Sequence, residues 1–170
     1  DGDSVTSLTA TGVGGDITTG ALFATGTAEG LATVTLTATE GSDISIGAIV
    51  ADSTVDNVTD NAMTVTASAN GTATGSDVSS VTVAGINNTL GSLALVFSGD
   101  QNVNSTGNDI ADSITLTRTG SGDSTVNNIN STTTFTATHT GSGDLTITGF
   151  DAEGDVTIDS SGASGALSVN

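Results

Sequence analysis

The sequence predicts an all-β protein, and specifically an irregular β-solenoid, or β-helix, of short strands joined by Gly-Asp turns. Three observations lead to this prediction. Apolar and polar residues alternate along many short segments, Gly, Asn and Asp separate these segments, and Thr, Val and Ile are frequent within them. β-Branched residues fit a pleated, half-buried surface and lose side-chain freedom in a helix. No segment combines helical periodicity with capping residues, so no helix is expected.

The two-residue period places each expected strand. In residues 33–39, TVTLTAT, the side chains of Val34, Leu36 and Ala38 face one way and the threonines face the other. The same criterion applies along the rest of the chain. The expected strands cover residues 4–10, 17–24, 33–39, 43–50, 63–68, 78–84, 92–98, 114–119, 134–140, 144–149, 155–159 and 166–169.

A short motif recurs before several of these strands. It consists of a Gly-rich turn, then Asp, then a strand, as in GSGDLT at Gly141. Gly allows a sharp turn, and the Asp side chain is expected to bond the turn backbone. Leu145, Val156 and Leu167 begin matching segments at a spacing of eleven residues. Two such units predict a rung of about twenty-two residues, and the regular repeat covers about residues 120–170.

An antiparallel β-sandwich or jelly roll is the alternative architecture. The spacing between motifs is larger and more variable upstream, which favours the sandwich. The small apolar side chains stack well in rungs, which favours the solenoid, and this is the architecture we adopt. We expect residues 1–170 to form a single all-β structural domain. The start at Asp1, without Met or signal peptide, indicates a mature product or a segment of a longer chain.

The charge and the hydropathy of the chain exclude two classes of protein, those that bind nucleic acid and those that span a membrane with a helix. Nineteen acidic residues oppose a single basic residue, Arg118, which gives a net charge of −18. A nucleic-acid-binding protein needs a basic surface, so that class is excluded. No apolar run is long enough to span a bilayer. Self-repulsion on this scale needs screening, which we expect from divalent cations or from high salt.

The side chains needed for catalysis are scarce. The chain contains no Lys and no Cys, a single Arg and a single His, His139. Sugar-cleaving sites normally stack their substrate on Trp or Tyr, and both are absent here. We interpret His139 as a strand-end residue packed against Phe135 and predict that the protein is not an enzyme.

Calcium is the expected cofactor, because hard cations bind oxygens of Asp, Asn and turn carbonyls. One candidate segment begins D-x-N-x-N, which places oxygens on one side of a loop, and a second is a D-x-E-G-D turn between two strands. The alternative is that these residues are only solvated turn residues. The candidate ligands are Asp100, Asn102, Asn104, Asp109 and Asp112 in the first segment, and Asp151, Glu153 and Asp155 in the second.

Two further sets of residues suit a surface protein. N-x-S/T sequons are candidate glycosylation sites, and they occur at Asn57, Asn70, Asn87, Asn104 and Asn130. Strands near the ends of the chain are candidates for donation to a neighbouring subunit, with Ser4, Val5, Leu8, Leu167 and Val169 as the assembly residues.

The segments GSGDLTITG and EGDVTIDSS, the Thr, Ala, Gly and Ser bias, and the absence of Cys resemble bacterial surface-layer (S-layer) proteins of the β-strand-repeat and RTX-type group. The likeness covers most of the chain in composition and about 50 C-terminal residues in pattern. Tandem RTX nonapeptides are absent; Thr106-Gly107-Asn108-Asp109 only echoes them. The resemblance implies a β-solenoid or sandwich module, calcium-dependent lattice formation and no enzymatic activity.

The expected function is therefore structural. We expect a non-catalytic subunit of an extracellular, self-assembling array or filament at the cell surface, stabilised by divalent cations. Copies of the same chain are its expected partners, and a cell-surface glycan is a candidate anchor. The alternative is a module of a large secreted adhesin that binds a surface, a glycan or ice. Threonine arrays on a flat solenoid face bind ice, but the unequal rungs argue against a regular array here.

Overall fold

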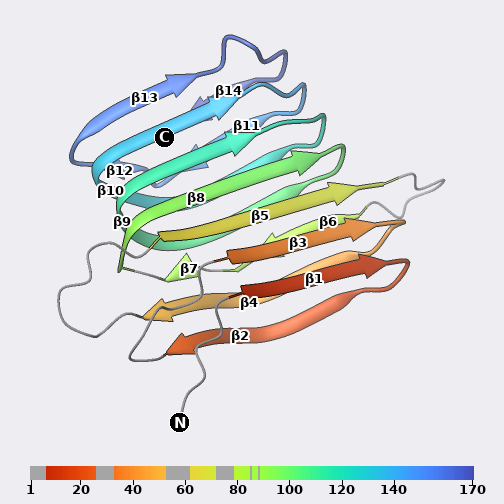
Figure 1. Cartoon of the computed structure of the whole chain (residues 1–170). Helices are drawn as coiled ribbons and strands as arrows, with labels where there is room; N and C mark the ends of the chain where they lie inside the picture. The colour runs from red at the N-terminus through yellow and green to blue at the C-terminus, as the bar shows by residue number, and fades with distance from the viewer. Residues whose placement is uncertain (1–6, 26–32, 53–61, 72–78, 85, 88) are drawn as a thin grey trace.

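The chain forms a parallel β-solenoid in a computed structural model (Figure 1). The structure describes residues 7–25, 33–52, 62–71, 79–84, 86–87 and 89–170. These residues form fourteen strands and no helix. Every pairing between the described strands is parallel, which is the arrangement of a solenoid and not of an antiparallel sandwich.

The strands make two long faces, which we call face A and face B, with a turn between them at each side. Face A contains β1 (Ser7–Val13), β3 (Thr33–Thr39), β5 (Ala62–Asn70), β8 (Thr89–Gly99), the second halves of β9 (Val103–Arg118) and β10 (Ser124–His139), and β13 (Asp155–Asp159). Face B contains β2 (Ile17–Thr25), β4 (Asp43–Asp52), β6 (Ser80–Val83), β7 (Ile86–Asn87), the first halves of β9 and β10, β11 (Leu145–Thr148) and β14 (Leu167–Val169). The short β12 (Asp151–Ala152) pairs with the middle of β10.

The rungs are regular in the C-terminal half and longer before it. Thr115 pairs with Thr136, and Thr136 pairs with Thr157, an offset of 21 residues at each step. At the turns, linked residues are 21 or 22 positions apart. Nearer the N-terminus, the link from Asp16 to Asp43 spans 27 residues and that from Asp43 to Ser80 spans 37. On face A the pairings of β1 with β3, β3 with β5 and β5 with β8 are continuous, so unequal rung length does not break its register.

Most of the expected strands are present with nearly the expected bounds. The segments 33–39 and 155–159 match β3 and β13 residue for residue. The expected strand at 4–10 corresponds to β1, although residues 4–6 lie outside the described part of the chain. The first halves of β9 and β10 were not expected. Their sequences, VNST and STVN, are polar enough to read as loop, yet they form face B strands.

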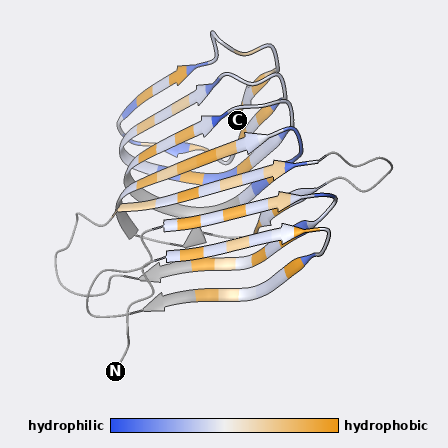
Figure 2. Ribbon diagram, turned by 45° about the vertical axis from the view of Figure 1, so that its right-hand side comes forward, coloured by the Kyte–Doolittle hydropathy of each residue, from blue (hydrophilic) through white to orange (hydrophobic). Residues whose placement is uncertain are grey.

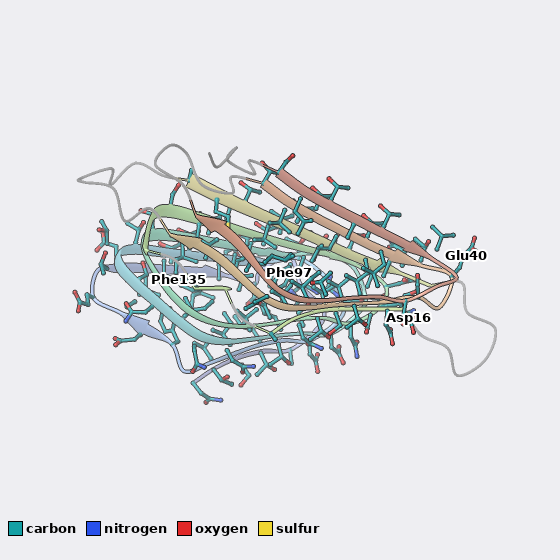
Figure 3. The ribbon with its side chains drawn as sticks, turned by 90° about the horizontal axis from the view of Figure 1, so that it is seen from below. Asp16, Glu40, Phe97 and Phe135 are labelled. Atoms are coloured by element: carbon teal, nitrogen blue, oxygen red, sulfur yellow. The ribbon has the colours of Figure 1, made fainter. Side chains whose placement is uncertain are left out.

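One cluster of buried side chains fills the space between the faces. Inward residues stack in columns, so that Leu95, Leu116 and Ala137 occupy one column on successive rungs. Figure 2 shows the resulting alternation of apolar and polar positions along each strand. Figure 3, seen from below, places Phe97 and Phe135 between the layers, with Asp16 and Glu40 at the turn that joins them. Small and branched side chains suit this thin core.

Glycines in the C-terminal turns stack on the backbone of the preceding rung with no room for a side chain. A Cβ at Gly143 would lie 2.0 Å from the carbonyl oxygen of Gly122 on the preceding rung. A Cβ at Gly122 would meet the carbonyl oxygen of Gln101 at 1.9 Å, and one at Gly165 would meet that of Gly143 at 2.0 Å. The turns at Gly122, Gly143 and Gly165 therefore approach the preceding rung too closely for a side chain, which explains the Gly before Asp123 and Asp144.

Substituting one of these glycines tests the stacking. Gly143→Ala should lower the free energy of unfolding by at least about 2 kcal/mol, because the methyl group forces the turn backbone apart. Gly20→Ala is the matched control, since nothing lies within 4 Å of its added Cβ. Urea unfolding of both variants measures the difference. Equal stability of the two would contradict the close approach of the turns.

Candidate functional site

Carboxylates of the Gly-Asp turns link successive rungs, and we call this row the aspartate ladder. Asp16 Oδ1 accepts the backbone amide of Asp43 at 2.9 Å. Asp123 Oδ1 accepts the amide of Asp144 at 2.8 Å, and Asp144 Oδ1 accepts that of Ala166 at 2.8 Å. Each of these carboxylates thus bonds the next rung, where the sequence predicted a bond within its own turn. Strands about 4.8 Å apart bring the equivalent amide within reach.

The first candidate calcium segment does not form a loop. Asp100 lies in a turn, where its Oδ1 accepts the amide of Gly71 at 2.9 Å. Asn102 and Asn104 bond the next rung. Asn102 Oδ1 accepts the backbone amide of Asp123 at 3.2 Å, and Asn104 Oδ1 accepts that of Thr125 at 3.1 Å. The side chains of Asn102 and Asn104 therefore link rungs on face B as the aspartates of the ladder do.

The remaining residues of that segment lie further along the same strand. Asp109 and Asp112 belong to β9, beyond its face B half, and their side chains lie outside the described set. Inter-rung pairing makes residues 103–118 a strand, where the sequence indicated a loop. Calcium binding by residues 100–112 stays a prediction.

The second candidate segment does form a turn. Asp151 belongs to β12, Asp155 begins β13, and Glu153 lies between them with its amide donated to the carbonyl of Ser131 at 2.9 Å. All three acidic side chains are exposed. Among the described side chains, no three acidic or histidine residues are grouped as a metal site would require. Calcium binding stays a prediction.

The single Arg and the single His of the chain are both inside the solenoid. Arg118 and His139 pair in register on adjacent rungs and are buried, as is Phe97 on the other side of Arg118. The Arg118 guanidinium donates to the carbonyl oxygens of Thr119 and Gly122 in the adjoining turn. Burial lowers its pKa, and nearby Asp123 partly opposes that shift. The buried Arg118 side chain thus binds the backbone carbonyls of the turn from inside the solenoid.

His139 has a different environment. Neither Nδ1 nor Nε2 has a hydrogen-bond partner, although both are buried. A neutral imidazole always carries one N–H donor and one acceptor, so two polar groups are left unsatisfied. His139 pairs with Arg118 and lies two inward columns from Phe135, with the column of Ala137 between them. Packing of His139 against Phe135 stays a prediction.

Replacing His139 tests this reading of the core. His139→Leu should raise the free energy of unfolding by about 1 kcal/mol, because it removes two unsatisfied buried polar atoms and keeps the volume nearly constant. Thermal and urea unfolding measure the change. A marked loss of stability would show that the ring makes an essential polar contact.

The five sequons fall in different settings. Asn70 is exposed at the end of β5, where its Nδ2 donates to Ser68 Oγ at 2.8 Å. Asn104 and Asn130 are half-buried in β9 and β10, and Asn104 already serves the ladder. Asn57 lies outside the described residues, as does the side chain of Asn87. Asn70 is therefore the most accessible of the described sequons.

The expected assembly residues lie at the two ends of the solenoid where they are described. Leu8 is partly buried on the first rung, in β1, whereas Leu167 and Val169 are in β14 on the last rung. Ser4 and Val5 precede the described part of the chain. At the last rung, hydrogen bonds from Ser161 lower the pKa of Asp159 and fix the start of the final turn.

No helix that could cross a membrane is found among the described residues. Comparison of the chain with protein families, with curated proteins and with solved structures finds no match.

Proposed function

We propose that this chain is a structural, non-catalytic subunit that builds an extracellular array or filament by stacking solenoid rungs end to end. The observation that carries the proposal is the apolar last rung. Val156 and Ile158 are 46 % and 38 % exposed, although they occupy the inward columns of face A. Their partners one rung earlier, Phe135 and Ala137, are fully buried. A further rung would bury the same positions.

Backbone pairing supports the same contact. The open edges of β13 and β14 present strand groups that a parallel neighbour can pair with, as an added strand does at any sheet edge. The first rung offers β1 and β2 in the same direction, with Leu8, Ala10 and Ile17 only partly buried. Stacking last rung on first rung is a head-to-tail contact, which generates an open filament when repeated.

The charges of the aspartate ladder fit this junction. The ladder position on the last rung is Ala166, and the ladder position on the first rung is Asp16. A second copy would therefore place an uncharged residue against a carboxylate, and not one carboxylate against another. The two copies meet without like-charge repulsion at this point, in a chain whose net charge is −18.

Neighbouring substitutions on the last rung test the stacking. Val156→Asp puts a charge on the inward side and should abolish concentration-dependent association, because the new carboxylate would be buried unpaired. Thr157→Asp puts the same charge on the adjacent outward position and should leave association intact. Analytical ultracentrifugation and electron microscopy measure both. A parent chain that stays monomeric at every concentration would contradict the proposal.

The cation requirement is tested separately. We expect calcium to promote association, since divalent cations screen the acidic surface, and a chelator should dissolve the assemblies. Electron microscopy of the purified chain with calcium, with chelator and with matched sodium chloride separates specific binding from ionic screening. Assemblies that survive chelation unchanged would contradict calcium dependence while leaving end-to-end stacking in place.

A further inference from the structure

The outward side of face A is a regular array of threonine and other small side chains, which we call the threonine face. Adjacent strands hold it in register from β1 to β13. Its two longest columns are Ser7, Thr33, Thr64, Ala94, Thr115, Thr136 and Thr157, and Thr9, Thr35, Thr66, Val96, Thr117, Thr138 and Asp159.

Unequal rungs do not disturb this array. On the sequence alone, varying rung length argued against regular threonine spacing. The pairings show that the columns continue through both the long N-terminal and the short C-terminal rungs. The array therefore repeats at about 4.8 Å from strand to strand and at about 6.6 Å between alternate residues of one strand. Its members are exposed or half-buried.

The array is also uncharged, in a strongly acidic protein. Both columns lack an ionisable side chain until Asp159 on the last described rung, although the chain carries nineteen acidic residues. Face B differs, because its outward column of Thr125 and Thr146 runs beside Asp123 and Asp144 of the aspartate ladder. From β1 to β10, the two columns therefore present hydroxyl and methyl groups without a charged side chain.

We propose that the threonine face binds ice. Each hydroxyl both donates and accepts hydrogen bonds, so rows of threonine can hold water molecules at the two repeats of the array. These repeats are comparable with the spacings of water oxygens on the faces of ice crystals. The intervening methyl groups limit competing arrangements of water, and the absence of charge avoids strongly hydrated groups. Ala94 and Val96 interrupt the hydroxyls on β8, and Val96 keeps the shape of threonine.

Two further occupants are compatible with a regular hydroxyl-bearing face: a crystalline polysaccharide and a second copy of the chain. The two-dimensional repeat favours a ligand that is itself periodic in two directions. Ice is periodic in two directions on each crystal face, and its water molecules can hydrogen-bond the threonine hydroxyls. The inference concerns the side of the solenoid and does not depend on stacking at its ends.

A pair of matched double variants tests the proposal. Thr66→Lys with Thr117→Lys places two bulky charges in one column of face A, and Thr125→Lys with Thr146→Lys places the same charges on face B. All four positions face outward, so circular dichroism and melting curves should match the parent. Thr66→Val with Thr117→Val is the second face A pair, which preserves side-chain shape if the Lys variants fail to fold.

The measurements are partition of the purified chain into a growing ice crystal, and the gap between its melting and freezing points. We expect the parent and the face B variant to enter the ice and to shape its crystals, and the face A Lys variant to lose both effects. A parent chain excluded from ice like an ordinary soluble protein would overturn the proposal. Equal loss in both Lys variants would also overturn it. So would binding to cellulose or chitin powder that depends on Thr66 and Thr117 while the same variants leave ice unaffected. Dimerisation with the same dependence would overturn it as well.

Discussion

Parallel pairing of each rung with the next, in continuous register on face A, is the constraint on which the rest of this structure depends. It brings like residues into columns, so a feature that suits one rung must suit its neighbours. Gly122 follows this logic directly, because the space above it is filled by the Gln101 backbone and the same crowding recurs at Gly143 and Gly165. The repeated glycine of the sequence is thus a packing requirement between rungs and not only a turn preference within one.

The same constraint stacks carboxylates, and the chain limits the cost in two ways. Bonded carboxylates accept a backbone amide from the following rung, which disperses their charge into hydrogen bonds. Uncharged residues also interrupt the row before a third carboxylate can follow. In rung order the ladder reads Asp16, Asp43, Ser80, Asn102, Asp123, Asp144 and Ala166. Ser80 keeps the ladder connected by donating its hydroxyl to Asp43 at 2.9 Å.

Two-residue alternation predicted the all-β class and most strands, whereas the eleven-residue spacing of the C-terminal motifs predicted the rung of about twenty-two residues and the small apolar side chains favoured the solenoid. Alternation failed at the first halves of β9 and β10, where Asn104 and Asn127 stand among polar neighbours. Those segments form strands because the adjacent rungs already supply a template, and such tertiary pairing leaves little trace in local composition. The D-x-N-x-N pattern also leads into one of these strands, where the sequence indicated a loop. Its side-chain oxygens match the ligands of a calcium loop, but equally suit amides one rung away. Arg118 and His139 lie on the same inward side as Leu116 and Ala137, as the two-residue period of β9 and β10 requires.

The burial of Arg118 and His139 determines which partners the outer surface can accept. The chain contains no other basic side chain, so none of its cationic side chains reaches the described surface. The interior arginine is occupied by turn carbonyls and leaves the acidic exterior uncompensated. Any neighbour must then either bring cations of its own, bind through counterions, or meet the molecule where it carries no charge. The threonine columns from β1 to β10 and the inward positions of Val156 and Ile158 on the last rung are uncharged, and both proposed contacts use them in place of the aspartate ladder.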